Sequence, residues 1–129
     1  MSVSVSEACP CGSGAVYAAC CGPLHDGEAA ATAERLMRSR YSAYALGRTD
    51  YVLRTWLPRT RPDDLDAAPP TTWLGLEVLR IEAGGPQDDF GLVEFRARFA
   101  GQHGDQTLHE TSRFERRGER WVYVEGELS

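Results

Sequence analysis

Four cysteines constrain this chain more than any other feature, because all of them fall within thirteen residues near its start. A Cys-x-Cys pair is followed by a glycine-rich turn and then by two adjacent cysteines, which gives the set Cys9, Cys11, Cys20 and Cys21. Four thiolates suit a tetrahedral Zn²⁺ ion, and the glycines of the turn let the backbone fold back over the metal. The spacing therefore predicts one zinc site that uses every cysteine of the chain.

Disulfide bonds are the alternative use of these cysteines. Adjacent Cys20 and Cys21 could bond to each other only through a strained vicinal bridge, so they would have to reach back to Cys9 and Cys11. Such a framework suits a secreted mini-protein, whereas residues 1–8 lack the apolar run and basic flank of a secretory signal. We therefore expect zinc as the cofactor and a cytoplasmic location. A purely structural zinc that no partner recognises is the simpler form of the same hypothesis.

Composition limits the kinds of partner that this chain can have. The formal net charge is −5, and it becomes more negative when four thiolates bind one divalent cation, which argues against a nucleic-acid-binding surface. No segment approaches the ~18 apolar residues of a membrane span. His25 lies four residues past Cys21 and could replace a thiolate, but four cysteines already fill a tetrahedral site. We expect neither nucleic acid nor a membrane as partner, and His25 outside the metal site.

The N-terminal motif is carried by Cys9-Pro10-Cys11-Gly12-Ser13-Gly14, then Tyr17, then Cys20-Cys21-Gly22. It resembles the SEC-C zinc motif, a small module found at the end of the translocation ATPase SecA, with Cys21 at the position of the last ligand. SEC-C modules often carry lysines between the turn and the last ligands, where this chain has Ala15, Val16, Ala18 and Ala19. If they are exposed, these apolar residues favour contact with a protein over contact with phosphate; the alternative is that they pack against the main domain. An adaptor that docks through the knuckle is therefore our leading functional hypothesis.

Beyond Pro23 the hydrophobic pattern divides into a helical part and a strand-rich part. Apolar side chains at helical spacing predict a first helix over residues 32–46, which Gly47 ends. A second helix is expected over residues 49–57, with Thr49 or Asp50 as its cap. Residues 59–72 are rich in proline and predict a loop. Alternating or apolar runs then predict four antiparallel strands at residues 73–82, 90–100, 106–116 and 120–127.

Several further motifs extend over nearly the full length of the chain. They are Leu36-Met37-Arg38-Ser39-Arg40-Tyr41-Ser42-Ala43-Tyr44, Asp50-Tyr51, Thr55-Trp56, Trp73–Leu76, Val93–Phe99, Glu110, Ser112–Phe114 and Trp121–Gly126. With the cysteine motif they resemble the YchJ family, bacterial proteins in which SEC-C precedes a nuclear-transport-factor-2-like domain. The resemblance implies an α+β fold, in which a zinc knuckle (residues 1–24) precedes a cone of helices packed on a curved antiparallel sheet (residues 25–129). It implies a metal and no particular reaction.

One pair of charged residues lies on apolar faces of this predicted domain. Arg40 falls in the middle of the apolar stripe of the first helix, and Glu110 alternates with apolar residues on the third strand. An unpaired buried charge is costly, so we expect Arg40 and Glu110 to face each other. A structural ion pair that fixes the helix on the sheet is the simpler interpretation. His109 then points to the opposite face.

The functional interpretation of the same pair is a small polar pocket. We expect it to be lined by Arg40, Tyr44, Trp56, Glu110 and Ser112. Related cone-shaped folds bind small molecules in such a cavity, including ketosteroid-isomerase-like chemistry with Glu110 as base and Tyr41 or Tyr44 as oxyanion donor. A small-molecule-binding module or enzyme is therefore the alternative to the adaptor, and a structural metalloprotein is the third hypothesis. The sequence does not decide whether a reaction is catalysed.

Overall fold

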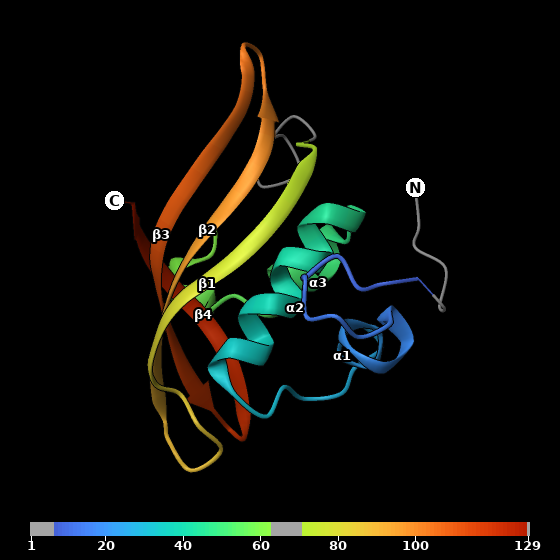
Figure 1. The fold of residues 1–129 in the computed structure, drawn as a ribbon. Coiled ribbons are helices and arrows are strands. Elements are labelled where there is room, and N and C mark those ends of the chain that lie inside the picture. The colour runs from blue at the N-terminus through green and yellow to red at the C-terminus, as the bar shows by residue number, and fades with distance from the viewer. Residues whose placement is uncertain (1–6, 63–70, 129) are drawn as a thin grey trace.

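The structure is a computed structural model and describes residues 7–62 and 71–128. Its elements are, in order, η1 (Tyr17–Ala19), α1 (Cys21–His25), α2 (Ala33–Leu46), α3 (Thr49–Arg54), η2 (Pro58–Thr60), β1 (Trp73–Ala83), β2 (Phe90–Gly101), β3 (Gly104–Arg117) and β4 (Arg120–Leu128). The four strands form one antiparallel sheet in the order β1-β2-β3-β4, and the helices lie on one face of it (Figure 1). This is the predicted α+β layout with a four-stranded meander. The predicted cone and sheet curvature stay predictions.

Helix α2 is the central element of the helical layer and begins and ends where the sequence predicts. The Thr32 side chain accepts a hydrogen bond from the backbone N–H of Arg35, which caps the first turn. Gly47 ends the helix in the left-handed conformation, with φ of 74°. Eight of its residues are buried, on more than one side of the helix, so α2 is covered by the sheet and by the N-terminal segment.

Helix α3 is shorter than predicted and ends at Arg54 instead of Leu57. The expected cap at Thr49 or Asp50 is also wrong, because the N-cap is Arg48 and no side chain caps it. The reason for the early end is that the next residues run alongside β4. The Leu57 N–H donates to the Tyr123 carbonyl at 2.8 Å, and the Tyr123 N–H donates to the Thr55 carbonyl at 2.8 Å. Sheet pairing thus competes with the last helical turn.

Part of the predicted loop over residues 59–72 is described, and it contains the 3₁₀ turn η2. Residues 63–70 lie outside the described part of the chain. No helix within residues 7–62 and 71–128 is long and apolar enough to cross a membrane.

The register of β2 and β3 determines which side chains face the helices. Phe95 pairs with Glu110, and Val93 pairs with Ser112, so these four side chains share the inner face of the sheet. Strand β4 departs from simple alternation, because its register against β3 shifts between Arg113 and Phe114. Such a bulge places two residues of one strand opposite one of the other and re-aims the side chains beyond it.

The buried core is continuous from the cysteine motif to the sheet. All four cysteines belong to the same cluster of buried residues as Leu36 and Met37 of α2 and Phe95 and Phe114 of the sheet. The N-terminal knuckle therefore packs directly on the helical layer (Figure 1). The predicted boundary between residues 1–24 and 25–129 stays a prediction.

Candidate metal centre and ligand pocket

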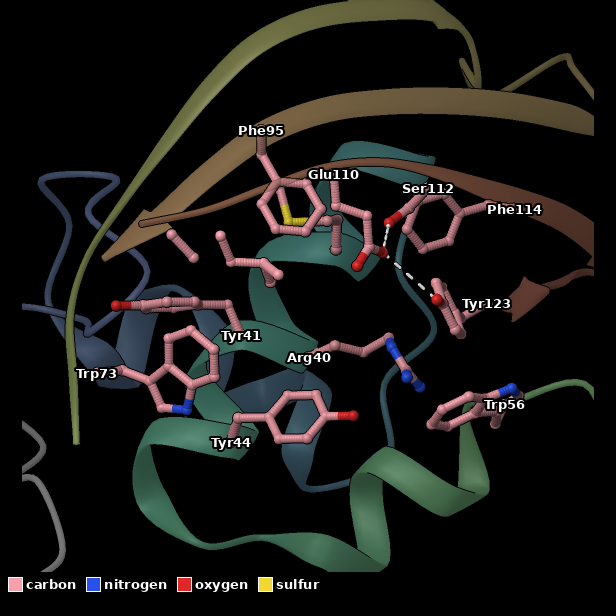
Figure 2. Close-up of a pocket in the computed structure, with 13 residues that line it drawn as sticks. Arg40, Tyr41, Tyr44, Trp56, Trp73, Phe95, Glu110, Ser112, Phe114 and Tyr123 are labelled. Atoms are coloured by element: carbon pink, nitrogen blue, oxygen red, sulfur yellow. Dashed lines mark hydrogen bonds between the residues drawn. The ribbon is translucent and has the colours of Figure 1, made fainter. Parts of the chain in front are cut away.

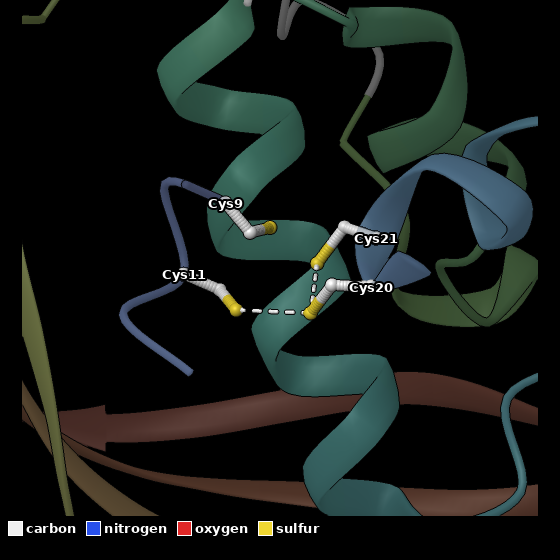
Figure 3. A group of neighbouring side chains, drawn as sticks. All are labelled: Cys9, Cys11, Cys20 and Cys21. Carbon is white, nitrogen blue, oxygen red and sulfur yellow. Dashed lines mark hydrogen bonds between the residues drawn. The ribbon is translucent and has the colours of Figure 1, made fainter. Parts of the chain in front are cut away.

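The four cysteine sulfurs lie together beside the middle of α2 (Figure 3). All of the Sγ atoms lie within 4.8 Å of one another, and all four residues are buried. Cys11 Sγ is 3.6 Å from Cys20 Sγ, which is 4.0 Å from Cys21 Sγ. A tetrahedral ion with metal–sulfur bonds of about 2.3 Å needs sulfur–sulfur distances of about 3.8 Å. The residues therefore fit one four-coordinate metal ion.

The sulfur distances also bear on the disulfide alternative. Disulfide bonds need sulfurs about 2.0 Å apart, and all four cysteines are free. The crowded thiols shift one another's pKa values. Hydrogen bonds from Cys11 and Cys21 lower the pKa of Cys9, whereas hydrogen bonds with Cys11 and Cys9 raise the pKa of Cys21 above its ordinary value. A bound cation removes this conflict, because it stabilises all four thiolates at once.

Helix α2 supports the cysteine cluster through side chains that the sequence analysis did not assign. Arg35 donates from Nη1 to Cys20 Sγ at 3.4 Å and from Nη2 to the Cys20 carbonyl at 2.8 Å. Ser42 donates to Cys21 Sγ at 3.3 Å, and its Oγ lies 3.4 Å from Cys9 Sγ. Hydrogen bonds of this kind orient metal ligands and temper their charge. Both residues occupy one helical face, and that spacing was the signal available in the sequence.

His25 stays outside the cluster, as expected from the sequence. It is 2% exposed, and its Nδ1 accepts from the Tyr17 hydroxyl at 2.6 Å while Nε2 donates to the Ser39 carbonyl at 2.9 Å. Burial lowers its pKa below the ordinary value. Both ring nitrogens are occupied, so neutral His25 connects the knuckle to α2.

The apolar residues of the knuckle divide into two groups. Val16 is 42% exposed, and Ala18 and Ala19 are also exposed. Ala15 and Tyr17 are half-buried and pack against the core. A small apolar surface is therefore accessible beside the metal centre.

A cavity of about 270 Å³ lies between α2 and the inner face of the sheet (Figure 2). All five residues that the sequence analysis assigned to a pocket line this cavity, namely Arg40, Tyr44, Trp56, Glu110 and Ser112. Helix α2 supplies the first two, the segment after α3 supplies Trp56, and β3 supplies the last two. The structure thus brings them together at one place, and whether they bind a ligand stays a prediction.

The expected ion pair between Arg40 and Glu110 is not formed. Arg40 is buried, with 5% exposure, and its Nη1 donates to the Val52 carbonyl at 2.7 Å and to Thr55 Oγ1 at 2.8 Å. Its guanidinium carbon lies 5.0 Å from the Trp56 ring centre and 4.5 Å from the Tyr123 ring centre. Two aromatic faces and the carbonyl end of α3 hold the charge instead. Burial lowers the pKa of Arg40.

Glu110 belongs to a separate polar group on the sheet. Its Oε2 accepts from Ser112 Oγ at 2.5 Å and from the Tyr123 hydroxyl at 3.4 Å (Figure 2). Burial, followed by the negative charge of Glu110, raises the pKa of Tyr123. Gly126 leaves room for the carboxylate, because a Cβ at that position would collide with it. Tyr123 therefore lies between Arg40 and Glu110, contacting one with its ring and the other with its hydroxyl.

The other end of the cavity is apolar. It is lined by Met37, Tyr41, Trp73, Phe95, Ala97 and Leu108, whereas Phe114 packs on Tyr123 at the polar end, with ring centres 5.7 Å apart. Trp73 packs edge-on against Tyr41, with ring centres 5.8 Å apart. Burial raises the pKa of Tyr44, and the nearby positive charge of Arg40 opposes this shift. The cavity thus has a polar end near Arg40 and an aromatic end near Trp73.

The outer face of the sheet carries His109, as predicted. His109 Nε2 lies 2.7 Å from Glu94 Oε2, and Glu94 also pairs with Arg80 at 3.2 Å. Both contacts are on the face opposite the cavity. His109 therefore takes no part in the pocket.

Comparison with known proteins places the N-terminal cysteine motif and the α+β domain that follows it in one family. The family described as YchJ, middle NTF2-like domain, matches residues 32–126, and the SEC-C motif matches residues 6–23. A UPF0225 protein of Streptomyces coelicolor is 52% identical over 121 residues, which cover 93% of this chain and 94% of that protein. A UPF0225 protein of Chromobacterium violaceum is 53% identical over 124 residues, which cover 92% and 91%.

Two solved structures are similar to this chain over nearly its full length. The solution structure of a SEC-C motif containing protein from Rhodopseudomonas palustris is 40% identical, has a TM-score of 0.78, and aligns with 94% of this chain and 98% of its own. The crystal structure of a SEC-C motif containing protein from Psychrobacter arcticus is 31% identical, has a TM-score of 0.73, and aligns with 94% and 82%.

Proposed function

The chain belongs to the YchJ family, and from the geometry of its two sites we propose that it is a cytoplasmic zinc protein that binds a small molecule. The zinc ion is structural and is held by Cys9, Cys11, Cys20 and Cys21. The ligand occupies the cavity between α2 and the sheet. The observation that carries the proposal is the buried guanidinium of Arg40, which reaches this cavity without a carboxylate partner among the described residues.

The chemistry of the cysteine cluster supports zinc and a structural role. A tetrahedral set of four thiolates is typical of zinc or of iron–sulfur centres, and sites closed by four protein ligands are structural. The ligands are buried and are supported by Arg35 and Ser42, so no position is left for a substrate. Reduced thiols fit a reducing compartment such as the cytoplasm.

Metal analysis tests this part of the proposal directly. Purified protein is expected to carry about one equivalent of zinc. The variant Cys20→Ser is expected to carry none. Iron with acid-labile sulfide would contradict zinc, and a metal-free protein that has lost its free thiols would contradict metal binding altogether.

The cavity supports ligand binding by its size and by its lining. A volume of about 270 Å³ is sufficient for a small organic molecule, and binding pockets are commonly apolar with a few fixed polar groups. Here the fixed groups are Arg40, Tyr44 and Glu110, and aromatic rings supply the rest of the wall. Similar folds use such cavities for small molecules, but fold alone does not determine function. The proposal therefore depends on Arg40 and not on the fold.

A matched pair of substitutions tests whether the cavity binds a ligand. Ala97 is 1% exposed and lines the cavity, whereas Ala100 is exposed on the same strand. Native mass spectrometry of protein purified from its own host is expected to detect a bound small molecule that Ala97→Leu removes and Ala100→Leu retains. Equal retention by both folded variants would place the ligand elsewhere.

A docking surface on the knuckle is the second candidate function. Its support is the accessible apolar surface formed by Val16, Ala18 and Ala19, next to a motif shared with SEC-C modules. The surface is small, and Val16 is its one large side chain. An exposed apolar patch beside a rigid metal centre is suited to contact with another protein.

A positive charge introduced on this apolar surface distinguishes the docking function from the ligand-binding function. Val16→Lys is expected to abolish capture of a protein partner from lysate without changing the melting temperature, because Val16 is exposed. Leu74→Lys, at a similarly exposed position on β1, is the matched control. If both variants capture the same proteins as the wild type, the adaptor hypothesis fails and the ligand-binding proposal is unaffected.

A further inference from the structure

The hydrogen bonds that anchor the guanidinium of Arg40 use one of its three nitrogens. Both of them, to the Val52 carbonyl and to Thr55 Oγ1, come from Nη1. The Tyr44 hydroxyl is directed at the same guanidinium (Figure 2). Arg40 and Tyr44 both line the cavity, so Nε and Nη2 can donate to a ligand there beside the Tyr44 hydroxyl.

The guanidinium is also fixed in orientation and has no ion-pair partner among residues 7–62 and 71–128. The rings of Trp56 and Tyr123 pack against it, and the carbonyl of Val52 anchors one end. The charge of Glu110 acts on it only from beyond ion-pair distance, and burial lowers the pKa of Arg40 despite that charge. A planar, immobilised guanidinium matches the geometry of a carboxylate, which it binds bidentately.

Glu110 limits the charge that the cavity accepts. Its carboxylate lines the same cavity and accepts hydrogen bonds from Ser112 and Tyr123, which hold it on the sheet side. A ligand with one carboxylate can place it at Arg40, which forms no ion pair with Glu110. A second carboxylate would face either Glu110 or the apolar end, where nothing compensates it.

The remaining wall determines the body of the ligand. Away from Arg40 the cavity is lined by Trp73, Phe95 and Leu108, whose side chains are largely apolar. The ring of Trp73 stands against those of Tyr41 and Tyr44, with centres 5.8 and 6.4 Å apart, and all three rings line the cavity. Flat aromatic walls favour a flat apolar body.

From this geometry we infer that the cavity binds a compact aromatic monocarboxylate. Its carboxylate accepts hydrogen bonds from Nε and Nη2 of Arg40, and its ring lies against Trp73 and Phe95. The inference rests on the proposed ligand-binding function and adds the chemical class and the orientation of the ligand.

Matched probes that differ only in charge test the inference. We would titrate the zinc-loaded full chain with phenylacetate and 2-naphthoate, and with their uncharged amides, phenylacetamide and 2-naphthamide. Backbone and indole ¹H–¹⁵N spectra report the affinity and locate the site. Each carboxylate is expected to bind about tenfold or more tightly than its amide, because hydrogen bonds to charged groups are the stronger ones. The shifted signals are expected to include the Trp73 indole.

Substitutions on the two sides of the cavity make the test specific. Arg40→Gln is expected to remove the preference for the carboxylate. If Arg40→Gln does not fold, Glu110→Gln provides the test, because Glu110 is half-buried and its amide keeps the shape. Glu110→Gln is expected to tighten carboxylate binding about threefold or more, since it removes a repulsive charge.

The outcomes separate this inference from the proposed function. Amides that bind as tightly as carboxylates, or carboxylate binding that weakens in Glu110→Gln, would overturn the ligand class while leaving a ligand-binding pocket. If neither probe of either pair shifts any cavity signal at millimolar concentration, the inference is wrong, and the mass-spectrometric test of Ala97→Leu then decides the proposed function independently.

Discussion

The two faces of helix α2 perform opposite tasks. On one face, Arg35 and Ser42 donate hydrogen bonds to a cysteine cluster in which every sulfur is buried among partners. On the other face, Arg40 and Tyr44 border a cavity, and the hydrogen bonds that anchor Arg40 use only one of its nitrogens. A closed site that satisfies its own ligands stabilises a fold, whereas polar groups fixed at the wall of a cavity are typical of sites that bind a ligand.

The two faces also differ in the groups that surround the positive charge of their arginine, Arg35 on one face and Arg40 on the other. Arg35 lies beside thiolate sulfur and hydrogen-bonds to Cys20 with two nitrogens. Arg40 lies between the aromatic rings of Trp56 and Tyr123 and bonds to neutral oxygens with one nitrogen. The same residue type on the same helix therefore supports the cysteine cluster in one place and borders the cavity in the other. Four predictions test this contrast, from the largest expected effect to the smallest.

Removal of the metal should have the largest effect. Cys11→Ser is expected to abolish zinc binding and to lower the free energy of unfolding by several kcal/mol, because structural zinc contributes about 10–16 kcal/mol in small zinc-binding peptides. The knuckle should unfold while the β2–β3 pairing survives, which ¹H–¹⁵N spectra and zinc content would measure. Ser13→Ala is the control, since Ser13 contacts Cys20 Sγ without being a ligand. Full zinc occupancy in Cys11→Ser would contradict the assigned ligand set.

Loss of the buried guanidinium should have an intermediate effect. Arg40→Met removes the hydrogen bonds to the Val52 carbonyl and the Thr55 hydroxyl and the contacts with two rings. We expect a loss of about 2–4 kcal/mol in chemical denaturation, because relief of the buried charge offsets only part of this cost. Arg54→Met, half-exposed above Tyr51, is the matched control and should change stability by about 0.5 kcal/mol or less. Equal effects of both changes would mean that Arg40 is not buried in solution.

The sequence predicted the metal ligands and most of the fold because these features depend on local spacing. Cysteines at fixed separations specify a site without reference to the rest of the chain, and Gly47 ends α2 by a local rule. Alternation along β3 likewise predicted that Glu110 and Ser112 face the helices, because β2 and β3 pair without a bulge. Local rules were sufficient wherever the structure keeps a regular period.

The errors arose where distant segments compete. Residues 55–57 leave the predicted helix because their backbone bonds to β4, which no local propensity specifies. The register shift in β4 hid Tyr123, whose ring contacts Arg40 and whose hydroxyl bonds to Glu110, so that each charge has a neighbour other than its predicted partner. Both errors concern β4, the last strand, whose partners cannot be identified by period alone.

Titration of His25 should give a smaller effect with a defined sign. Burial lowers the pKa of His25 in the folded protein, whereas the unfolded chain titrates near 6.5. Above that pH both states are neutral and the stabilisation is complete. As pH falls below about 6.5, the unfolded state takes up a proton that the folded state does not, so stability falls by up to about 1.4 kcal/mol per pH unit.

Denaturation midpoints between pH 7.5 and 5.5 measure the His25 effect. His25→Gln is expected to flatten the pH dependence relative to the wild type, whereas His103→Gln, at an exposed position, should leave it unchanged. The metal centre contributes its own pH dependence to all three proteins, so the comparison among them isolates His25. If His103→Gln flattens the pH dependence and His25→Gln does not, the pH dependence does not come from His25 and the prediction is wrong.

The smallest expected effect is the coupling between Arg40 and Glu110, and it bears most directly on the cavity. A buried ion pair broken by removal of one partner typically costs about 3–5 kcal/mol, and its two members are then strongly coupled. Here the Tyr123 ring lies 4.5 Å from the guanidinium and its hydroxyl lies 3.4 Å from the carboxylate, so each charge has its own neighbours. A double-mutant cycle of Arg40→Met and Glu110→Gln should therefore give about 1 kcal/mol or less. Coupling of 3 kcal/mol or more would mean that Arg40 turns to Glu110 in solution. The cavity would then satisfy its own charge and, like the cysteine cluster, would be a closed site.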